Sequence, residues 1–197
     1  MIKKPIMKMK KIEQFAAQKA RGRDYNHDMN HIYRTVRLAK YIAKKEKADM
    51  DVCAVSAMLH DIGQSIRVKD HHITGAKMAR KFLKGLKLDD DFIEEVAYCI
   101  YCHSSRTVKE SKTIEAKVLY DADMLQCIGP FGYTRLLTTF TVFDGMGLLE
   151  SIDEIKNTEK KVKRLLQTKT GRKLAEDLFK FMKGFYKRYE KWDKAKI

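Results

Sequence analysis

Apolar residues recur every three or four positions through most of the chain, which is the spacing of amphipathic helices. In the segment 26–47 they form one stripe along a long helix. The segment 51–63 is instead apolar almost throughout until His60 and Asp61, which predicts a buried helix. Further helices are expected over 71–86, 89–103 and 113–129. The pattern predicts an all-α protein.

The length and composition are typical of a globular chain. Its 197 residues, 44% hydrophobic and 34% charged, suffice for a single domain spanning 1–197 with its own core. The longest apolar run is far too short to cross a bilayer. The basic residues 1–15 never develop the apolar stretch of a secretory signal. We therefore expect a cytoplasmic protein with reduced thiols and no membrane association.

One short motif suggests a different chemistry. Cys99, Cys102 and His103 spell C-x-x-C-H, the pattern that attaches c-type haem. Attachment of that kind belongs to exported proteins, and the chain shows no export signal. The helical pattern that begins at Asp89 also places Cys99 on an apolar face, as a small core residue. We therefore expect no haem, and His103 needs another role.

The net charge of +15 is unevenly distributed. Residues 1–50 carry a balance of +9 and residues 151–197 a balance of +8, whereas residues 51–150 carry −2. Such basic flanks could attract nucleic acid, an anionic membrane surface or phosphorylated small molecules. No basic run is interleaved with stacking aromatic residues or tied to a nucleic-acid-binding motif. The alternative, of about equal weight, is that these charges belong to solvated helix faces such as that of residues 160–167.

The histidines are more informative, because all six lie between residues 27 and 103. A lone histidine is more often a satisfied polar residue than a ligand, but six in one region beside aspartates favour a metal centre. His60 and Asp61 end an apolar helix, where an unpaired carboxylate would be costly and metal coordination would compensate it. His27 and His31 are four residues apart and share a helix face. The other three histidines are His71, His72 and His103.

Two aspartates, Asp121 and Asp123, lie in the middle of the apolar segment 113–129. Side chains at positions i and i+2 of a helix face different directions. Only one of the two is therefore expected to point into a site, and the spacing leaves open which one.

These segments together resemble the HD-domain superfamily of metal-dependent phosphohydrolases, which is named for its His-Asp doublet. The doublet stands in AMLHDIG, and NHDMNHIYRTVRLA resembles the H-D-x-x-H opening of the family. VLYDADMLQCIGPFG resembles the D-A-D-x-L closing motif of one branch of small bacterial and archaeal HD hydrolases. HHITGA and YCHSS stand where many members carry two more histidines. The match covers residues 24–135, and the basic segment 150–197 is expected to form a helical tail.

The resemblance implies roles for particular residues. Asp123 matches the family aspartate because it follows a small residue and precedes x-Leu, so Asp121 and His27 would stand behind the ligands or beside the substrate. In members with two metals the doublet aspartate bridges, and His71 and His103 would hold the second ion. In members with one metal the same histidines contact the phosphate or activate water. The implied ligands of the first ion are His31, His60, Asp61 and Asp123.

The residue types suit this chemistry. Imidazole and carboxylate ligands bind divalent Mn, Fe, Zn, Co or Ni, and also Mg. Such an ion lowers the pKa of a bound water and neutralises charge that builds up on phosphorus. Positive side chains should then hold the phosphates. Arg34, one turn beyond His31, and Arg106, after the His103 motif, are the candidates, and a surface role in solubility is the alternative for each.

We therefore predict an all-α, single-domain helical bundle of the HD type. We expect it to hydrolyse a phosphate ester or anhydride of a small substrate, and a nucleotide is the favoured substrate. One alternative is a metal- or nucleotide-binding regulator without turnover, and another is a nucleic-acid-binding protein that uses its basic flanks. The doublet is followed by Ile62, Gly63 and Gln64, so the acidic catalytic residue that some nucleotidases carry just after it is missing, which argues against their mechanism. The chain also lacks the G-Y-P motif of cyclic-dinucleotide hydrolases.

Overall fold

The computed structural model describes residues 8–23, 27–64 and 69–195, and within them the secondary structure is helical, without strands. The predicted all-α class is therefore confirmed. Short 3₁₀ or π segments, η2 (Val108–Glu110), η3 (Leu125–Cys127) and η4 (Thr139–Phe143), join some of the helices. The α-helices are α1 (Met9–Ala20), α2 (Met29–Glu46), α3 (Met50–Leu59), α4 (His71–Gly85), α5 (Asp90–Cys102), α6 (Ile114–Met124), α7 (Gly129–Thr138), α8 (Leu148–Leu165) and α9 (Lys169–Asp193).

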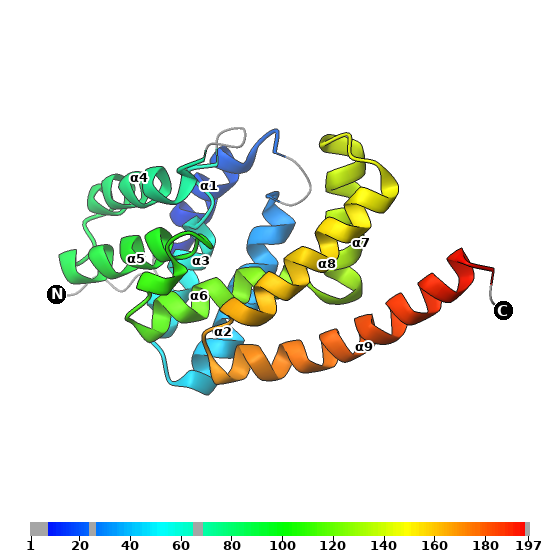
Figure 1. Ribbon diagram of the computed structural model, residues 1–197. Helices are drawn as coiled ribbons and strands as arrows, with labels where there is room; N and C mark the ends of the chain where they lie inside the picture. The colour runs from blue at the N-terminus through cyan, green and yellow to red at the C-terminus, as the bar shows by residue number, and fades with distance from the viewer. Residues whose placement is uncertain (1–7, 24–26, 65–68, 196–197) are drawn as a thin grey trace.

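Part of the bundle packs around α3, whose residues 52–59 are all buried. α2, α5 and α6 contact α3, and α4 packs along α5 at one end of the molecule (Figure 1). α7 and α8 stand at the other end, and α9 runs beneath them and extends beyond the bundle. Among the described helices, none combines the length and apolar character needed to cross a bilayer. The core positions the end of α3, where the His-Asp doublet lies, in the middle of the bundle.

Aspartate side chains cap the N-termini of three helices. Asp28 precedes α2, and its carboxylate accepts a hydrogen bond from the backbone N–H of His31 at 2.8 Å. Asp49 and Asp89 cap α3 and α5 in the same way. The spacing predicted that His27 and His31 share a helix face. Because α2 begins at Met29, His27 instead precedes the helix, and this prediction is wrong.

The turn after the doublet lies directly against the start of α4. A Cβ atom added at Gly63 would stand 2.1 Å from the carbonyl oxygen of His71 and 2.5 Å from the backbone nitrogen of Gly75. Only glycine permits so close an approach of two backbones. This contact brings the end of α3 and the first residue of α4 side by side.

Candidate metal centre

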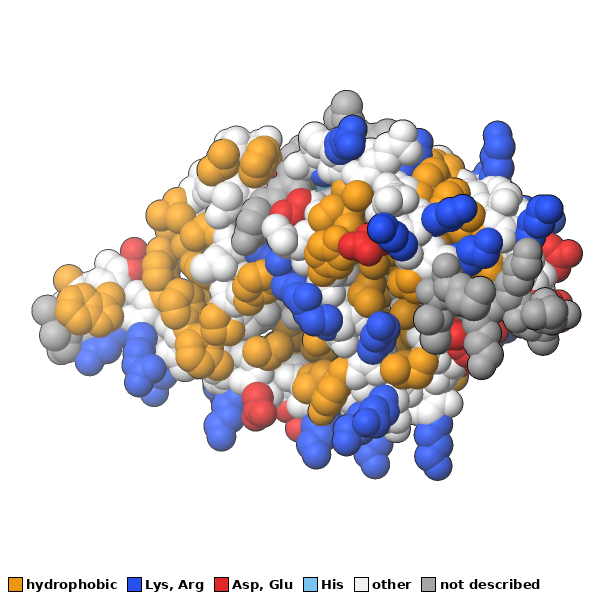
Figure 2. Space-filling model, turned by 180° about the vertical axis from the view of Figure 1, so that it is seen from behind, with side chains coloured by type: hydrophobic (Ala, Val, Ile, Leu, Met, Phe, Trp, Pro, Cys, Tyr) orange, Lys and Arg blue, Asp and Glu red, His pale blue; other side chains and the backbone are white. Residues whose placement is uncertain are grey.

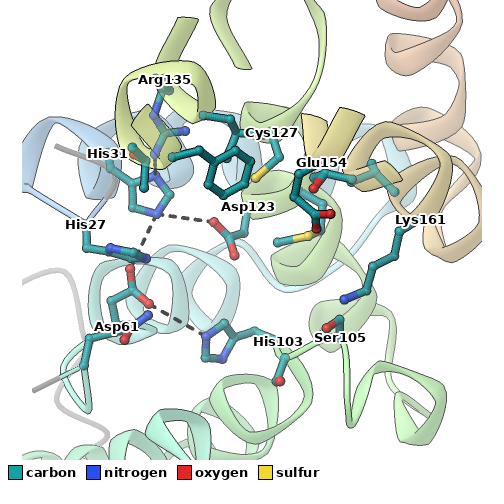
Figure 3. A pocket seen from close by; sticks show the side chains of 18 of the residues that line it. His27, His31, Asp61, His103, Ser105, Asp123, Cys127, Arg135, Glu154 and Lys161 are labelled. Atoms are coloured by element: carbon teal, nitrogen blue, oxygen red, sulfur yellow. Dashed lines mark hydrogen bonds and ion pairs between the residues drawn. The ribbon is translucent and has the colours of Figure 1, made fainter. Parts of the chain in front are cut away.

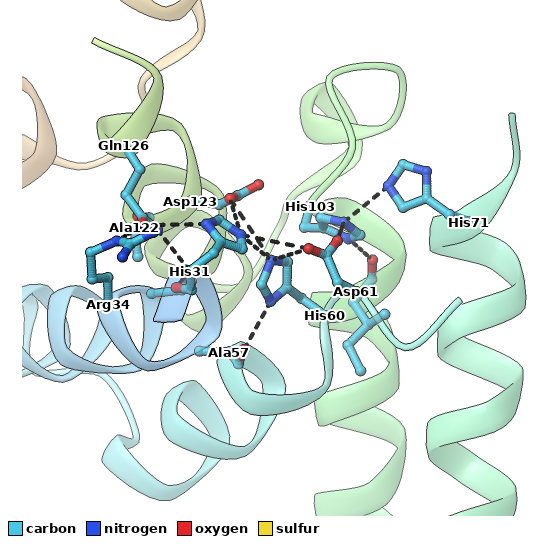
Figure 4. Close-up of polar contacts among 12 residues, drawn as sticks. His31, Arg34, Ala57, His60, Asp61, His71, His103, Ala122, Asp123 and Gln126 are labelled. Carbon is cyan, nitrogen blue, oxygen red and sulfur yellow. Dashed lines mark hydrogen bonds and ion pairs between the residues drawn. The ribbon is translucent and has the colours of Figure 1, made fainter. Parts of the chain in front are cut away.

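Four side chains from three parts of the chain meet in the middle of the bundle (Figure 4). His31 comes from the first turn of α2, His60 and Asp61 directly follow α3, and Asp123 belongs to the last turn of α6. The Nε2 atom of His31 lies 3.1 Å from Nε2 of His60 and 3.3 Å from Oδ1 of Asp123. Oδ2 of Asp61 lies 3.2 Å from Nε2 of His60. The fold therefore brings together the four residues expected to bind one ion.

A second group adjoins the first, at the start of α4 and the end of α5. Nε2 of His103 lies 3.2 Å from Nε2 of His71 and 3.8 Å from Oδ1 of Asp61. The other oxygen of Asp61, Oδ2, faces His31 and His60. The Asp61 carboxylate thus lies between two sets of side chains that could hold a metal ion, His31–His60–Asp61 and Asp61–His71–His103.

Each of the three buried imidazoles of the cluster has an oxygen beside its Nδ1 atom. Such an acceptor keeps the proton on Nδ1, so that the lone pair of Nε2 is directed into the cluster. The ring orientations are therefore those of metal ligands that bind through Nε2. The oxygens belong to the side chain of Gln126 for His31, the carbonyl of Ala57 for His60 and the carbonyl of Ile100 for His103.

Gln126 is itself held in one orientation. Its amide nitrogen donates to the hydroxyl of Thr35 at 2.7 Å, and its Oε1 accepts from Nε of Arg34 at 3.0 Å. The oxygen is therefore the atom that faces Nδ1 of His31, at 3.2 Å.

Burial and neighbouring charges move the pKa values of the cluster in different directions. Burial, with a contribution from His60, lowers the pKa of His103 to about 4. Burial also acts to lower the pKa of His60, but the carboxylates of Asp61 and Asp123 outweigh it and raise that pKa to about 9. For Asp61, burial acts to raise the pKa, and the neighbouring imidazoles hold it well below its usual value. The cluster therefore combines ionised carboxylates with a proton that a divalent cation would replace.

The donor set fits a divalent metal ion. Oδ2 of Asp61 is buried and accepts no hydrogen bond from the described residues. The Nε2 atoms of His31 and His60, 3.1 Å apart, need a proton or a cation between them. Imidazole and carboxylate ligands bind such ions at about 2.0–2.2 Å, which puts two adjacent ligand atoms about 3.0–3.4 Å apart. The spacings of 3.1, 3.2 and 3.3 Å agree with that value, while His31–Asp61 at 3.5 Å and His60–Asp123 at 3.8 Å are longer.

Asp121 points away from Asp123, to the opposite side of α6. Its carboxylate accepts hydrogen bonds from the backbone N–H groups of Gln167 at 2.8 Å and Thr168 at 2.7 Å, and from the Thr168 hydroxyl at 2.6 Å. It is fully buried and does not line the pocket beside the cluster. The sequence placed Asp121 behind the ligands or beside the substrate; its carboxylate instead lies outside the pocket lining and fixes the junction of α8 and α9.

Three more residues were predicted to lie near the substrate or the ligands: His27, Arg34 and Arg106. His27 lines the pocket, with its ring centroid 6.2 Å from that of His31. Arg34 lies behind the cluster, where its side chain donates to Gln126 and does not line the pocket. Arg106 is exposed and donates to a backbone carbonyl just before α4, also outside the pocket lining. Of the two arginines predicted to bind phosphate, neither lines the pocket.

The sequence reading missed Arg135, which lies on α7 and lines the pocket although it is only 5% exposed. One guanidinium nitrogen donates to the backbone carbonyl of Gln126 at 3.0 Å, and the other approaches Nδ1 of His31 at 3.3 Å. Arg135 is the only Lys or Arg between Lys117 and Lys156. A lone cation in a long stretch without other basic residues was the available signal.

The pocket above the cluster has a volume of about 600 Å³. His31, Asp61, His103 and Asp123 form one wall, and residues of α7, η4 and α8 form the opposite wall (Figure 3). Cys99 and Cys102, the cysteines of the C-x-x-C-H motif, are buried in the core and do not line the pocket. Burial raises the pKa of both thiols.

An all-α bundle with buried histidines and aspartates between its helices is the arrangement of a helical metal-binding domain. The sequence model of the HD domain matches residues 29–127. The chain belongs to the HD-domain family. The match includes His31, His60, Asp61, His71, His103 and Asp123.

Several known proteins are similar along most of the chain. Bacillus subtilis YpgQ is 29% identical over 174 residues, which are 84% of this chain and 83% of YpgQ. A crystal structure of YpgQ in complex with ADP superposes with a TM-score of 0.78 at 25% identity and covers 95% of this chain and 96% of that one. A predicted HD superfamily hydrolase from an uncultured Thermotogales bacterium has a TM-score of 0.71 at 27% identity, with 94% and 93% covered.

A more distant similarity joins the chain to part of a larger enzyme. Ribonuclease Y of Acidothermus cellulolyticus is 26% identical over 149 residues, which are 74% of this chain but only 27% of the ribonuclease.

Proposed function

We propose that this protein is a metal-dependent phosphohydrolase that cleaves a phosphate ester or anhydride of a nucleotide. The observation that carries the proposal is the position of Asp61, whose carboxylate lies between two sets of ligating side chains at the wall of a pocket. Enzymes that cleave phosphate esters use such paired sites to hold the attacking and leaving oxygens. Membership of the HD-domain family supports the same chemistry.

In this proposal His31, His60, Asp61 and Asp123 hold one divalent ion. His71 and His103 hold a second ion together with Asp61, or contact the substrate phosphate when one ion is bound. When bound, the metal supplies positive charge and a water molecule of lowered pKa. Imidazole and carboxylate donors suit Mn, Fe, Zn, Co, Ni and Mg, and the metal preference is to be measured.

The residues of the chain position the reacting groups. Gln126 and the two backbone carbonyls fix the imidazole rings. Arg135 places a permanent positive charge beside His31, where it would offset the charge of a substrate phosphate. During hydrolysis the oxygen of water bonds to phosphorus, the bond from phosphorus to the leaving oxygen breaks, and the departing oxygen takes up a proton.

A nucleotide is the proposed substrate because of the size and lining of the pocket. A volume of about 600 Å³ suits a ligand of nucleotide size. The wall opposite the cluster includes apolar side chains, Leu136 and Phe140, beside polar ones. The similar protein YpgQ binds ADP in its crystal structure.

Metal analysis paired with hydrolysis assays tests the proposal. Plasma mass spectrometry of the purified protein, before and after chelation, should find one or two equivalents of a divalent metal. Restoring Mn, Co, Ni, Mg or Zn should then restore release of phosphate or pyrophosphate from a panel of nucleotides. Metal without release from any nucleotide would favour a non-catalytic metal- or nucleotide-binding regulator, and no metal under any condition would contradict the proposed site.

RNA is the second candidate substrate, favoured by the similarity to part of ribonuclease Y and by the basic flanks. Binding of single-stranded RNA that falls steeply with salt and survives in His60→Ala would support a nucleic-acid-binding role without the cluster. Cleavage of RNA that His60→Ala abolishes would make RNA a substrate of the proposed site.

A further inference from the structure

One face of α8 forms the wall of the pocket opposite the histidine and aspartate cluster (Figure 3). Glu154, Asn157, Thr158 and Lys161 line the pocket, at positions i, i+3, i+4 and i+7 of the helix. The opposite face of α8 is buried, with Ile152 and other residues in the interior. Lys161, which belongs to the basic segment 160–167, is exposed to solvent as that reading expects and also lines the pocket.

The polar side chains on this face have no partners within the described parts of the chain. Glu154, Asn157 and Lys161 make no hydrogen bond or ion pair there. One other lysine of α8 is engaged: Nζ of Lys156 lies 3.5 Å from a Glu190 oxygen and 3.9 Å from an Asp153 oxygen. The pocket-facing groups of α8 are therefore available to a ligand, and their position in the pocket lining distinguishes them from the other charged groups of the helix.

The charges on this face are separated along the helix axis. Lys161 and Glu154 are seven residues apart, or about 10 Å along an α-helix. Figure 3 shows the Lys161 side chain reaching toward Ser105, which follows α5, while Glu154 lies on the Cys127 side of the pocket. A ligand that spans the pocket would meet a cation at one end of α8 and a carboxylate at the other.

We propose that this face of α8 recognises the substrate, with Lys161 binding a phosphate group and Glu154 accepting a hydrogen bond from a hydroxyl or amino group of the organic part. The inference rests on the proposed function for the identity of the pocket as the substrate site. Lysine is a point donor that suits phosphate oxygens, and a carboxylate is an acceptor that suits the O–H and N–H groups of a sugar or base. Glu154 also repels a phosphate, so the two residues fix the direction in which the substrate lies.

Binding experiments with two probes separate the roles of the two residues. The probes are ADP and inorganic pyrophosphate, measured by calorimetry on the full chain loaded with Mn. Lys161→Ala should weaken both probes by on the order of 10-fold, the effect of losing one charge-assisted contact. Glu154→Gln should weaken ADP and leave pyrophosphate unchanged or slightly tighter, because pyrophosphate has no organic part.

The same helix provides matched controls. Lys160 and Asp153 are exposed neighbours that do not line the pocket. Lys160→Ala and Asp153→Asn should therefore bind both probes within about two-fold of the unmodified protein, since loss of distant surface charge is largely screened. Thermal unfolding of all four variants checks that the bundle is intact.

Three results would overturn the inference. The first is that Lys161→Ala and Lys160→Ala weaken the probes equally. The second is that Glu154→Gln weakens pyrophosphate as much as it weakens ADP. The third is that the unmodified protein binds neither probe. If ADP and pyrophosphate bind as expected but no nucleotide or RNA is hydrolysed, the proposed function fails while the recognition role of α8 stands.

Discussion

At the scale of single residues, the oxygen atom beside the Nδ1 atom of each buried imidazole sets the orientation of the ring. An oxygen holds the Nδ1 atom of His31, His60 and His103, and their Nε2 atoms converge around the carboxylate of Asp61. A buried carboxylate without a hydrogen-bond donor is costly, and a cation between these groups removes that cost. Asp61 is therefore the residue on which the proposed site depends most.

Asp61→Ala should abolish metal binding and hydrolysis together, because it removes the one carboxylate that faces both sets of ligands. Metal content by plasma mass spectrometry and phosphate release from nucleotides are the two measurements. Asp153→Ala, which removes a carboxylate whose side chain is 76% exposed, is the control and should keep both properties. A folded Asp61→Ala protein with full activity would show that the proposed site is wrong.

His103→Ala should reduce hydrolysis by about 10²-fold or more, the usual cost of losing a group that acts on the reacting atoms. The variant should retain more bound metal than Asp61→Ala, because His103 belongs to only one of the two sets of proposed ligands. His72→Ala is the matched control, since His72 is a buried neighbour that does not line the pocket. Turnover that is the same in His103→Ala and His72→Ala would place His103 outside the site.

At the scale of helices, α6 serves two sides of the molecule. Asp123 faces the cluster, while Asp121 binds the backbone at the start of α9. Gly171, in the first turn of α9, lies directly against this contact: a Cβ atom there would stand 2.2 Å from Oδ2 of Asp121 and 2.9 Å from the Thr168 hydroxyl oxygen. The absence of a side chain at Gly171 lets α9 approach α6.

Gly171→Ala should lower the free energy of unfolding by about 1–3 kcal/mol, because the methyl group overpacks the Asp121 contact. Gly184→Ala in the same helix should raise it by roughly 0.5–1 kcal/mol, because nothing lies within 4 Å of the added Cβ and alanine favours the helix. Urea unfolding measures both changes. Shifts of the same sign in the two variants would contradict the role of Gly171.

At the scale of the whole molecule, the proposed ion would link elements from much of the chain. The ligating side chains come from α2, the turn after α3, α4, the end of α5 and α6. A ligand that binds only the folded state stabilises it in proportion to the logarithm of its concentration above the dissociation constant. Metal binding and folding stability are therefore expected to be coupled.

Adding metal at about 100 times its dissociation constant should stabilise the fold by roughly 2.7 kcal/mol, which is about 5–10 °C in Tm for a chain of this size. Differential scanning calorimetry of the chelated and restored protein measures the shift. Asp61→Ala should show no such shift. A Tm that does not respond to any of the tested metals would contradict binding at the cluster.

The sequence by itself determined the helical class and most of the candidate cluster. Helical periodicity and apolar runs depend on residues within a few turns of one another, so they can be recognised in the sequence. The His-Asp doublet, its position after a buried helix and the opposite directions of Asp121 and Asp123 follow from the same local rules.

Only the tertiary structure decided which distant side chains share the pocket. Arg135 and Lys161 come from helices about 100 residues or more beyond His31, and Arg34 and Arg106, which stand nearer the motifs in sequence, do not line the pocket. A local pattern gives the face of a helix on which a residue lies, but the packing of α7 and α8 against the bundle decides what that face meets. Lys161 reads as an ordinary solvated lysine until α8 is placed opposite the cluster.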